Sequence, residues 1–137
     1  MYLFTDTEIA SFFKKYEEFK IVLCESQISM FTKCNNILTE NTIYDRSQRE
    51  ILVYTPTTVH TYQYPLMHNK FIVFRKKVID KTGNVTMIND AVWTGSYNFT
   101  KNASNSLENA LLIENNDIAD LYYEEWTKIS AKPREIL

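Results

Sequence analysis

A histidine and a lysine two positions apart form the most chemically suggestive pair in the chain. His68 and Lys70 directly precede an apolar run with the composition of a β-strand. In an extended chain, residues two apart point to the same face, so both side chains can reach one ligand. The lysine can neutralise the non-bridging oxygens of a phosphate diester while the imidazole attacks phosphorus. The pair therefore indicates phosphodiester chemistry, whereas either residue alone beside a strand is more often an ordinary surface residue.

Two later polar stretches offer groups that suit the same phosphate. Gly95 lets the backbone approach a ligand closely, and Ser96 and Asn98, again two apart, offer a hydroxyl and an amide. Glu108 is an acceptor for the second nitrogen of a histidine, a bond that would fix the tautomer. Because lysine and amide donors supply the charge stabilisation, the set predicts catalysis with no metal and no other cofactor. The Gly-Ser-x-Asn pattern by itself is more typical of a turn.

The elements that must position these residues alternate along the chain. Apolar runs predict strands over 21–24, 51–54, 70–74, 85–88, 91–93 and 110–113, with a hairpin turn at 81–84. Helical spacing predicts a helix after Asp6 or Thr7, a second over 29–38, and a third from a cap at Asp117 to about residue 129, which Pro133 ends. Residues 41–49 have the composition of a loop, and 55–65 fit no pattern. The order predicts a single α/β domain over 1–137, with a mixed β-sheet flanked by helices.

The first and last helices carry apolar faces that we expect in the core. The residues are Ile9, Phe12, Phe13, Tyr16 and Phe19 at the first helix, and Ile118, Leu121, Tyr122 and Trp126 at the last.

The charge balance restricts the kinds of partner. The net charge is −2 and the sequence pI is about 5.7, so only a local patch could attract nucleic acid. The candidate patch is the basic run Arg75, Lys76 and Lys77, helped by Lys70 and Lys101. A solvated hairpin tip explains the run equally well.

The remaining composition points to a cytoplasmic protein. The two cysteines, Cys24 and Cys34, are too few for a disulfide scaffold, so we expect free thiols. No secretory leader pattern follows Met1, and no apolar run reaches the length of a membrane span. Association with a membrane is therefore not expected.

Taken together, the motifs resemble the phospholipase D superfamily, and within it the single-motif, nuclease-like branch. The resemblance rests on MHNKF at 67–71, VWTGSYNFT at 92–100, and N-x-x-E-N followed by an apolar strand and the helical pattern D-x-A-x-x-Y-x-x-E-W. It covers roughly 66–129 well. It is fainter upstream, where YLFTDTEIASFF and FKIVL resemble the family's first strand, helix and second strand.

The resemblance implies a role for each site residue. His68 would become transiently phosphorylated, Lys70 and Asn98 would bind the phosphate with Ser96 behind them, and Glu108 would orient the nucleophile. Members with one such motif pair two copies across a two-fold axis, and the second histidine protonates the leaving group. The expected function is that of a metal-independent phosphodiesterase, a nuclease that acts on nucleic acid as a homodimer.

Two features depart from the family pattern. Arg75 stands five residues after Lys70, where the family usually has an aspartate. Asp80 and Asp90, in the longer hairpin that follows, are candidates to replace that aspartate. The chain also starts inside what resembles the first strand, so the N-terminus of the fold looks shortened.

Two other functions stay open. The chain could be a catalytically inactive scaffold that binds nucleic acid or protein, for which Arg75 argues. It could also be a phosphodiesterase for phospholipids, against which the lack of a Lys- and Arg-rich amphipathic helix argues. His60, Tyr62 and Tyr64 could line the mouth of a cleft, although an ordinary loop explains them better.

Overall fold

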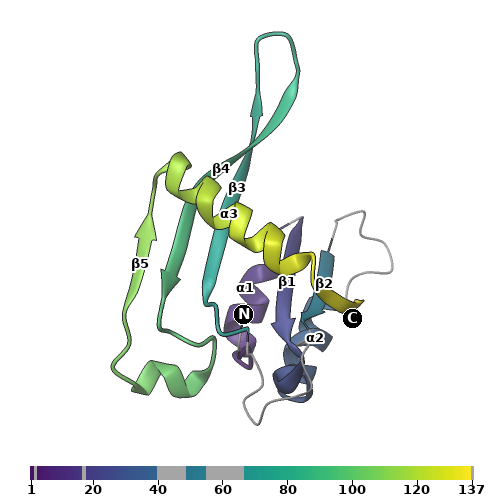
Figure 1. The fold of residues 1–137 in the computed structure, drawn as a ribbon, viewed down its shortest axis with the longest axis vertical. Helices are drawn as coiled ribbons and strands as arrows, with labels where there is room; N and C mark the ends of the chain where they lie inside the picture. Colours follow the sequence, from purple (N-terminus) through teal and green to yellow (C-terminus); the bar gives the residue numbers. More distant parts are fainter. Residues whose placement is uncertain (2, 17, 40–48, 55–66, 137) are drawn as a thin grey trace.

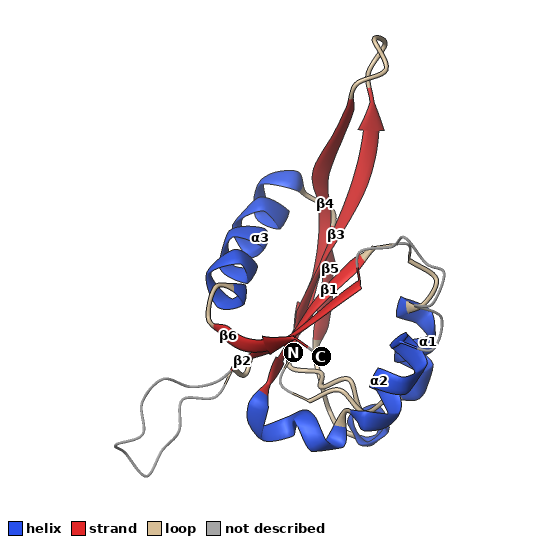
Figure 2. Ribbon diagram, turned by 90° about the vertical axis from the view of Figure 1, so that its right-hand side faces the viewer, coloured by secondary structure: helices blue, strands red, loops and turns tan. Residues whose placement is uncertain are grey.

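Strands between two layers of helices make up the protein. The computed structural model describes residues 1, 3–16, 18–39, 49–54 and 67–136. Helices α1 (Thr7–Phe13) and α2 (Thr32–Thr39) lie on one face of the strands, and α3 (Asn116–Ser130) crosses the other face (Figures 1 and 2). The described part also contains two 3₁₀ helices, η1 (Glu25–Met30) and η2 (Lys101–Asn105). These layers confirm the predicted α/β class.

The strands of the described residues form two three-stranded sheets. In the first sheet, β1 (Phe19–Cys24) pairs in parallel with β2 (Arg49–Tyr54), and β2 pairs antiparallel with β6 (Pro133–Ile136). In the second, β3 (Phe71–Ile79), β4 (Val85–Gly95) and β5 (Ala110–Ile113) are antiparallel in that order. The mixture of parallel and antiparallel pairs is the mixed arrangement that the sequence predicts.

The hairpin of β3 and β4 projects beyond the rest of the molecule (Figures 1 and 2). At its tip, the Asp80 carboxylate accepts hydrogen bonds from the backbone nitrogens of Thr82 (2.7 Å) and Asn84 (3.0 Å). The Thr82 hydroxyl and these backbone donors lower the pKa of Asp80 to about 2. Gly83 takes φ 87°, which glycine adopts without strain. The predicted turn at 81–84 is therefore confirmed.

Alternate residues of β1 pack into two separate cores. Ile21 and Leu23 belong to a cluster with aromatic residues of the α1 and α2 side, including Phe4 and Phe31. Val22 and Cys24 belong to a cluster against which side chains of α3 pack. Successive side chains of a strand point to opposite faces, so β1 is buried on both sides. This explains its continuous apolar sequence.

The first helix is shorter than its apolar spacing suggests. It ends at Phe13, so Phe19 lies in β1 instead of on the helix. Phe12 and Tyr16, which we expected in the core, are exposed and pack edge-to-face on each other at 5.5 Å between ring centroids. The predicted strand at 1–5 contributes only an isolated bridge, between Phe4 and Phe99.

The last helix also begins and ends differently from the prediction. Its N-cap is Asn115, whose side chain accepts a hydrogen bond from the backbone nitrogen of Ile118, and not Asp117. Leu121 is 64% exposed and Ile118 36%, because nothing in the described part covers this side of α3. The helix ends at Ser130, and Pro133 opens β6, a strand that we did not predict.

The remaining strands lie close to their predicted positions. The runs 85–88 and 91–93 belong to one long strand, β4, and the run 70–74 extends into the nine-residue β3. Of the predicted loop at 41–49, residues 41–48 lie outside the described residues and Arg49 begins β2. The unassigned stretch 55–65 also lies outside the described residues. Cys24 and Cys34 are buried free thiols, as expected. Among the described helices, none has the length and apolar character required to cross a membrane.

Gly95 stands where β4 and β5 approach each other most closely. A Cβ atom at this position would lie 2.1 Å from the carbonyl oxygen of Asn109 and 2.8 Å from the Cα of Ala110. Both neighbours are backbone atoms and cannot rotate away. Only glycine allows the pairing of β4 with β5 to continue to this end.

We therefore expect Gly95→Ala to lower the free energy of unfolding by about 3 kcal/mol, because the added methyl group must displace backbone. Gly83→Ala is the matched control: its positive φ costs about 1–2 kcal/mol, but a Cβ there meets nothing within 4 Å. Urea unfolding measures both. Equal losses for the two variants would contradict the proposed close approach at Gly95.

Candidate active site

Lys70 is the buried cation of the candidate site. The residue is 6% exposed, and its Nζ donates a hydrogen bond to the backbone oxygen of His68 at 2.8 Å. The same ammonium lies 3.0 Å from Nδ1 and 3.1 Å from Nε2 of the His68 ring. A neutral imidazole has one acceptor nitrogen, so the tautomer decides which contact is a hydrogen bond. The structure thus brings the two side chains into direct contact.

Two opposing effects act on the pKa of Lys70. Burial lowers the pKa of Lys70, while the negative charge of Glu108 raises it. Glu108 therefore acts electrostatically on Lys70, although it lies far away in the sequence.

His68 is exposed and opens onto a cleft of about 390 Å³. The cleft is lined by the segment around Lys70, by Gly95 at the end of β4, and by Leu121 and Glu125 of α3. The backbone nitrogen of Gly95 contacts the carbonyl oxygen of Lys70 at 3.4 Å and joins the two walls. A solvent-facing imidazole with a buried ammonium behind it can accept a phosphate from outside the protein.

Ser96 and Glu108 form a second pair. The Ser96 hydroxyl donates a hydrogen bond to the Glu108 carboxylate, and the backbone nitrogen of Asn109 donates to Ser96 Oγ at 3.1 Å. The backbone nitrogen of Ser96 donates in turn to the carbonyl oxygen of Asn109 at 2.9 Å. Our prediction did not include Asn109, although it is the last residue of the N-x-x-E-N stretch. The Glu108 hydrogen bond in this structure goes to Ser96.

Asn98 belongs to neither pair. Its Oδ1 is buried and has no hydrogen-bond partner among the described residues. Rotating the amide by half a turn would present its NH₂ group in place of the oxygen. Neither Asn98 nor Ser96 nor Glu108 lines the cleft at His68. Gly95 does line the cleft. We had expected this glycine to let the backbone approach a ligand, whereas in the structure it lets the backbone approach that of Asn109.

The hairpin residues do not supply the aspartate of the family pattern. The Arg75 guanidinium lies over the ring of Tyr123, 4.5 Å from its centroid, and lines a different cavity from the one at His68. Asp80 is engaged in the turn at the hairpin tip. Asp90 forms an ion pair with Lys76.

The basic run 75–77 does not form a single basic face. Lys76 pairs with Asp90, and Lys77 lies 3.6 Å from the Glu18 carboxylate. Neighbouring side chains of a strand also point to opposite faces. Arg75 and Lys77, two apart, share one face and line the same cavity, whereas Lys76 points to the other face and pairs with Asp90. The basic run is therefore divided between the two faces of β3, and its contact with nucleic acid stays a prediction.

Other candidate residues remain untested. His60, Tyr62 and Tyr64 lie outside the described residues. Within the described ranges, no group of three or more His, Cys, Asp or Glu side chains could hold a metal ion.

Removing the negative charge of Glu108 should lower the pKa of Lys70. In Glu108→Gln we expect the pKa of Lys70 to fall further, because desolvation then acts without the opposing carboxylate. The NMR titration of the Lys70 side chain measures this shift. Glu125→Gln removes a carboxylate that lines the cleft beside Lys70 and serves as the control. An equal shift in both variants would exclude a specific role of Glu108.

Comparison with known proteins extends these observations. Residues 1–129 match the family model described as cardiolipin synthase, PLD-like domain. An uncharacterised protein of Acanthamoeba polyphaga mimivirus is 29% identical over 110 residues, which are 80% of this chain and 35% of that protein. The chain thus spans about a third of the length of this curated relative.

A solved structure has the same fold. The crystal structure of the phospholipase D family member Nuc from Salmonella typhimurium matches with a TM-score of 0.65 at 24% identity, over 97% of this chain and 76% of that one. The family model covers residues 1–129, which is nearly the whole chain. This chain therefore belongs to the PLD-like domain family of the phospholipase D superfamily.

Proposed function

We propose that this protein is a phosphodiesterase that cleaves nucleic acid through a covalent phosphohistidine at His68. The observation that carries the proposal is the contact between the exposed His68 imidazole and the buried Lys70 ammonium. The backbone oxygen of His68 holds this ammonium in place. A fixed positive charge beside a nucleophile stabilises the oxygens of a phosphate as negative charge develops on them.

The proposed reaction has two displacement steps at phosphorus. A neutral nitrogen of His68 attacks phosphorus, a P–N bond forms, and the P–O bond to the leaving group breaks. The leaving oxygen takes a proton from a second acid. Water next attacks the phosphorus and gives a proton to the group that protonated the leaving oxygen, the P–N bond breaks, and both the imidazole and the acid are regenerated. Lys70 stays protonated in both steps, which requires no metal ion.

We assign supporting roles to the second pair and to Asn98. Ser96 and Glu108 are hydrogen-bonded to each other, and Glu108 also raises the pKa of Lys70. The negative charge of Glu108 keeps Lys70 protonated when a bound substrate excludes water from the cleft. The buried amide of Asn98, whose Oδ1 has no partner among the described residues, is a further group for phosphate binding.

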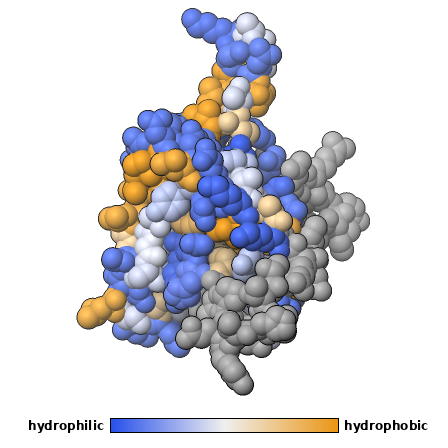
Figure 3. Space-filling model, in the orientation of Figure 1, coloured by the Kyte–Doolittle hydropathy of each residue, from blue (hydrophilic) through white to orange (hydrophobic). Residues whose placement is uncertain are grey.

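The second acid comes from a second copy of the chain. We propose a homodimer across a two-fold axis, in which the partner's His68 protonates the leaving oxygen. The support is a set of exposed leucines near the cleft, which we call the leucine patch: Leu121, which lines the cleft, Leu111, which lies opposite Thr94 of the cleft wall, and Leu107, each at least 64% exposed. Figure 3 shows separate groups of apolar atoms on the left-hand side of the molecule, the side on which β5 lies in Figure 1. Apolar surface of this kind typically marks an interface.

We propose nucleic acid as the substrate because the motifs resemble the nuclease-like branch of the superfamily. The exposure of His68 supports it, since an internal phosphate of a long polymer can reach only a group at the surface. With a net charge of −2, the protein offers little general attraction for DNA or RNA. Binding would therefore be weak and salt-sensitive, and specificity for sequence is not expected.

His68→Asn tests the nucleophile. We expect it to reduce metal-independent cleavage of bis(p-nitrophenyl) phosphate and labelled single-stranded DNA, measured in excess EDTA, by at least about a thousandfold. His60→Asn, which changes the other histidine of the chain, is the control and should retain activity. Rapid alkaline denaturation during turnover should trap the phosphohistidine in wild type alone. A folded, dimeric wild type without any turnover would favour the inactive binding scaffold instead.

Leu111→Glu tests the dimer. A charge in the leucine patch should convert the dimer to a monomer and abolish turnover, because each site would lose the partner's acid. Ile79→Glu places the same charge at the hairpin tip, where Ile79 is 68% exposed compared with 64% for Leu111. We expect this control to stay dimeric. Light scattering after size-exclusion chromatography measures both. A monomeric wild type with full activity would overturn the assembly.

A further inference from the structure

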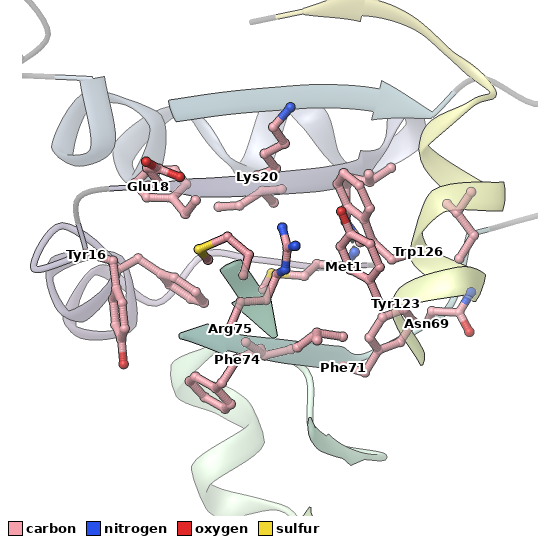
Figure 4. Close-up of a pocket in the computed structure, with 18 of the residues that line it drawn as sticks. Met1, Tyr16, Glu18, Lys20, Asn69, Phe71, Phe74, Arg75, Tyr123 and Trp126 are labelled. Carbon is pink, nitrogen blue, oxygen red and sulfur yellow. Dashed lines mark hydrogen bonds between the residues drawn. The ribbon is translucent and has the colours of Figure 1, made fainter. Parts of the chain in front are cut away.

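Helix α3 lines two hollow spaces of the described part. Tyr123 and Trp126 line the larger one, a cavity of about 640 Å³ between the two sheets (Figure 4). Leu121 and Glu125 line the other, the cleft at His68. Residues four apart are neighbours on the surface of an α-helix, so Leu121 and Glu125 lie side by side on the wall of this cleft. A carboxylate is thus placed in the space where the phosphate of a substrate would bind.

The cleft contains one full charge of each sign. Apart from the His68 imidazole, the charged side chains among the described residues that line it are Lys70 and Glu125. A second copy of the chain, as proposed above, would bring the same two residues. The balance of one carboxylate for each ammonium is therefore the same in a monomer and in a dimer.

The negative charge of Glu125 stays available to a ligand. The carboxylate that raises the pKa of Lys70 is that of Glu108, on a different part of the chain. Glu125 itself has Lys128 as its ion partner, but the two charged groups are 3.9 Å apart and the Lys128 side chain is 70% exposed. Exposed ion pairs of this kind are weak. Glu125 therefore repels an anion that enters the cleft.

An ammonium group alone would select the wrong phosphate. Coulomb attraction grows with the charge of the ligand. A phosphodiester carries one negative charge, whereas a phosphomonoester carries almost two above its second pKa of about 6. The monoester is the product, because hydrolysis of the phosphohistidine leaves a chain end with a terminal phosphate. With Lys70 as the single charge, the site would bind the product more tightly than the substrate. Repulsion by a carboxylate also grows with the charge of the ligand, so it offsets this preference.

We propose that Glu125 is a specificity-determining residue, which favours a singly charged phosphodiester over a doubly charged phosphomonoester in the His68 cleft. The inference rests on the proposed phosphodiesterase function. It names the internal linkages of a nucleic acid as the substrate, as opposed to terminal phosphates, and it gives the product a reason to leave. The Glu125 side chain takes no part in the bond changes at phosphorus.

Two ligands that differ by one charge test the proposal on the full chain. Thymidine 5′-phosphate is a monoester, and its methyl ester is a diester with the same base and sugar. NMR titration of the His68 ring signals gives the Kd of each ligand in excess EDTA at about pH 7.5, where the monoester is doubly charged. In Glu125→Gln we expect the Kd of the monoester to fall at least about threefold more than that of the diester, because the lost repulsion acted on twice the charge.

Glu124→Gln is the matched control. It removes the same charge from the preceding residue of α3, which is exposed and does not line the cleft, so the ratio of the two Kd values should stay that of the unmutated protein. Salt at about 1 M shortens the Debye length to about 3 Å and should reduce the effect of Glu125→Gln. An unchanged ratio in Glu125→Gln, an equal change in Glu124→Gln, or an effect that salt does not reduce would overturn the role of Glu125.

Kinetics separate this inference from the proposed function. The monoester p-nitrophenyl phosphate should inhibit turnover of bis(p-nitrophenyl) phosphate at least about threefold more strongly in Glu125→Gln than in the unmutated protein. Turnover with unchanged inhibition would refute the role of Glu125 and leave the phosphodiesterase standing. A changed Kd ratio in a protein without turnover would refute the phosphodiesterase and keep the selectivity of the cleft. Absence of binding of both thymidine ligands at His68 would overturn both.

Discussion

The burial of one ammonium group constrains the whole candidate site. Lys70 has lost nearly all contact with water, and a buried charge without partners would cost several kcal/mol. Its partners are the backbone oxygen and the ring of His68, and the Glu108 carboxylate compensates electrostatically. The backbone of Lys70 also contacts Gly95, so the same residue connects β3 with the end of β4. The His68 imidazole, the Lys70 ammonium and one wall of the cleft are thus positioned together.

The Ser96–Glu108 pair depends on a different constraint, the close approach of β4 and β5. The register places Gly95 opposite Ala110, and the lack of a Cβ lets the two backbones meet. Ser96 and Asn109 can then exchange backbone and hydroxyl hydrogen bonds, which orient the Ser96 hydroxyl toward Glu108. A pair separated by 12 residues is therefore organised by backbone geometry, while its carboxylate remains close enough to act on Lys70.

Helix α3 holds the two sheets in one molecule. Trp126 and Ile129 pack against the cluster of Val22, Cys24, Leu52 and Met67 in the first sheet. Tyr122 packs on Phe71 of the second sheet at 5.2 Å between ring centroids, and the Arg75 guanidinium lies over Tyr123. Arg75 consequently packs on α3. It lines the cavity between the two sheets and does not line the cleft at His68.

Periodicity and turn chemistry determined much of this protein, because they act over a few residues. The buried strand at 21–24, the hairpin turn at 81–84 and the order of the motif residues could all be predicted from local sequence. Only the tertiary structure decided what lies opposite each surface. Helical spacing placed Leu121 on an apolar face but could not show that this face borders an open cleft. Asn115 and Asp117 are both good caps, and the direction in which the chain leaves β5 selected the first. The contact of Ser96 with Glu108 required the register of two strands, since local sequence does not encode pairings across a sheet.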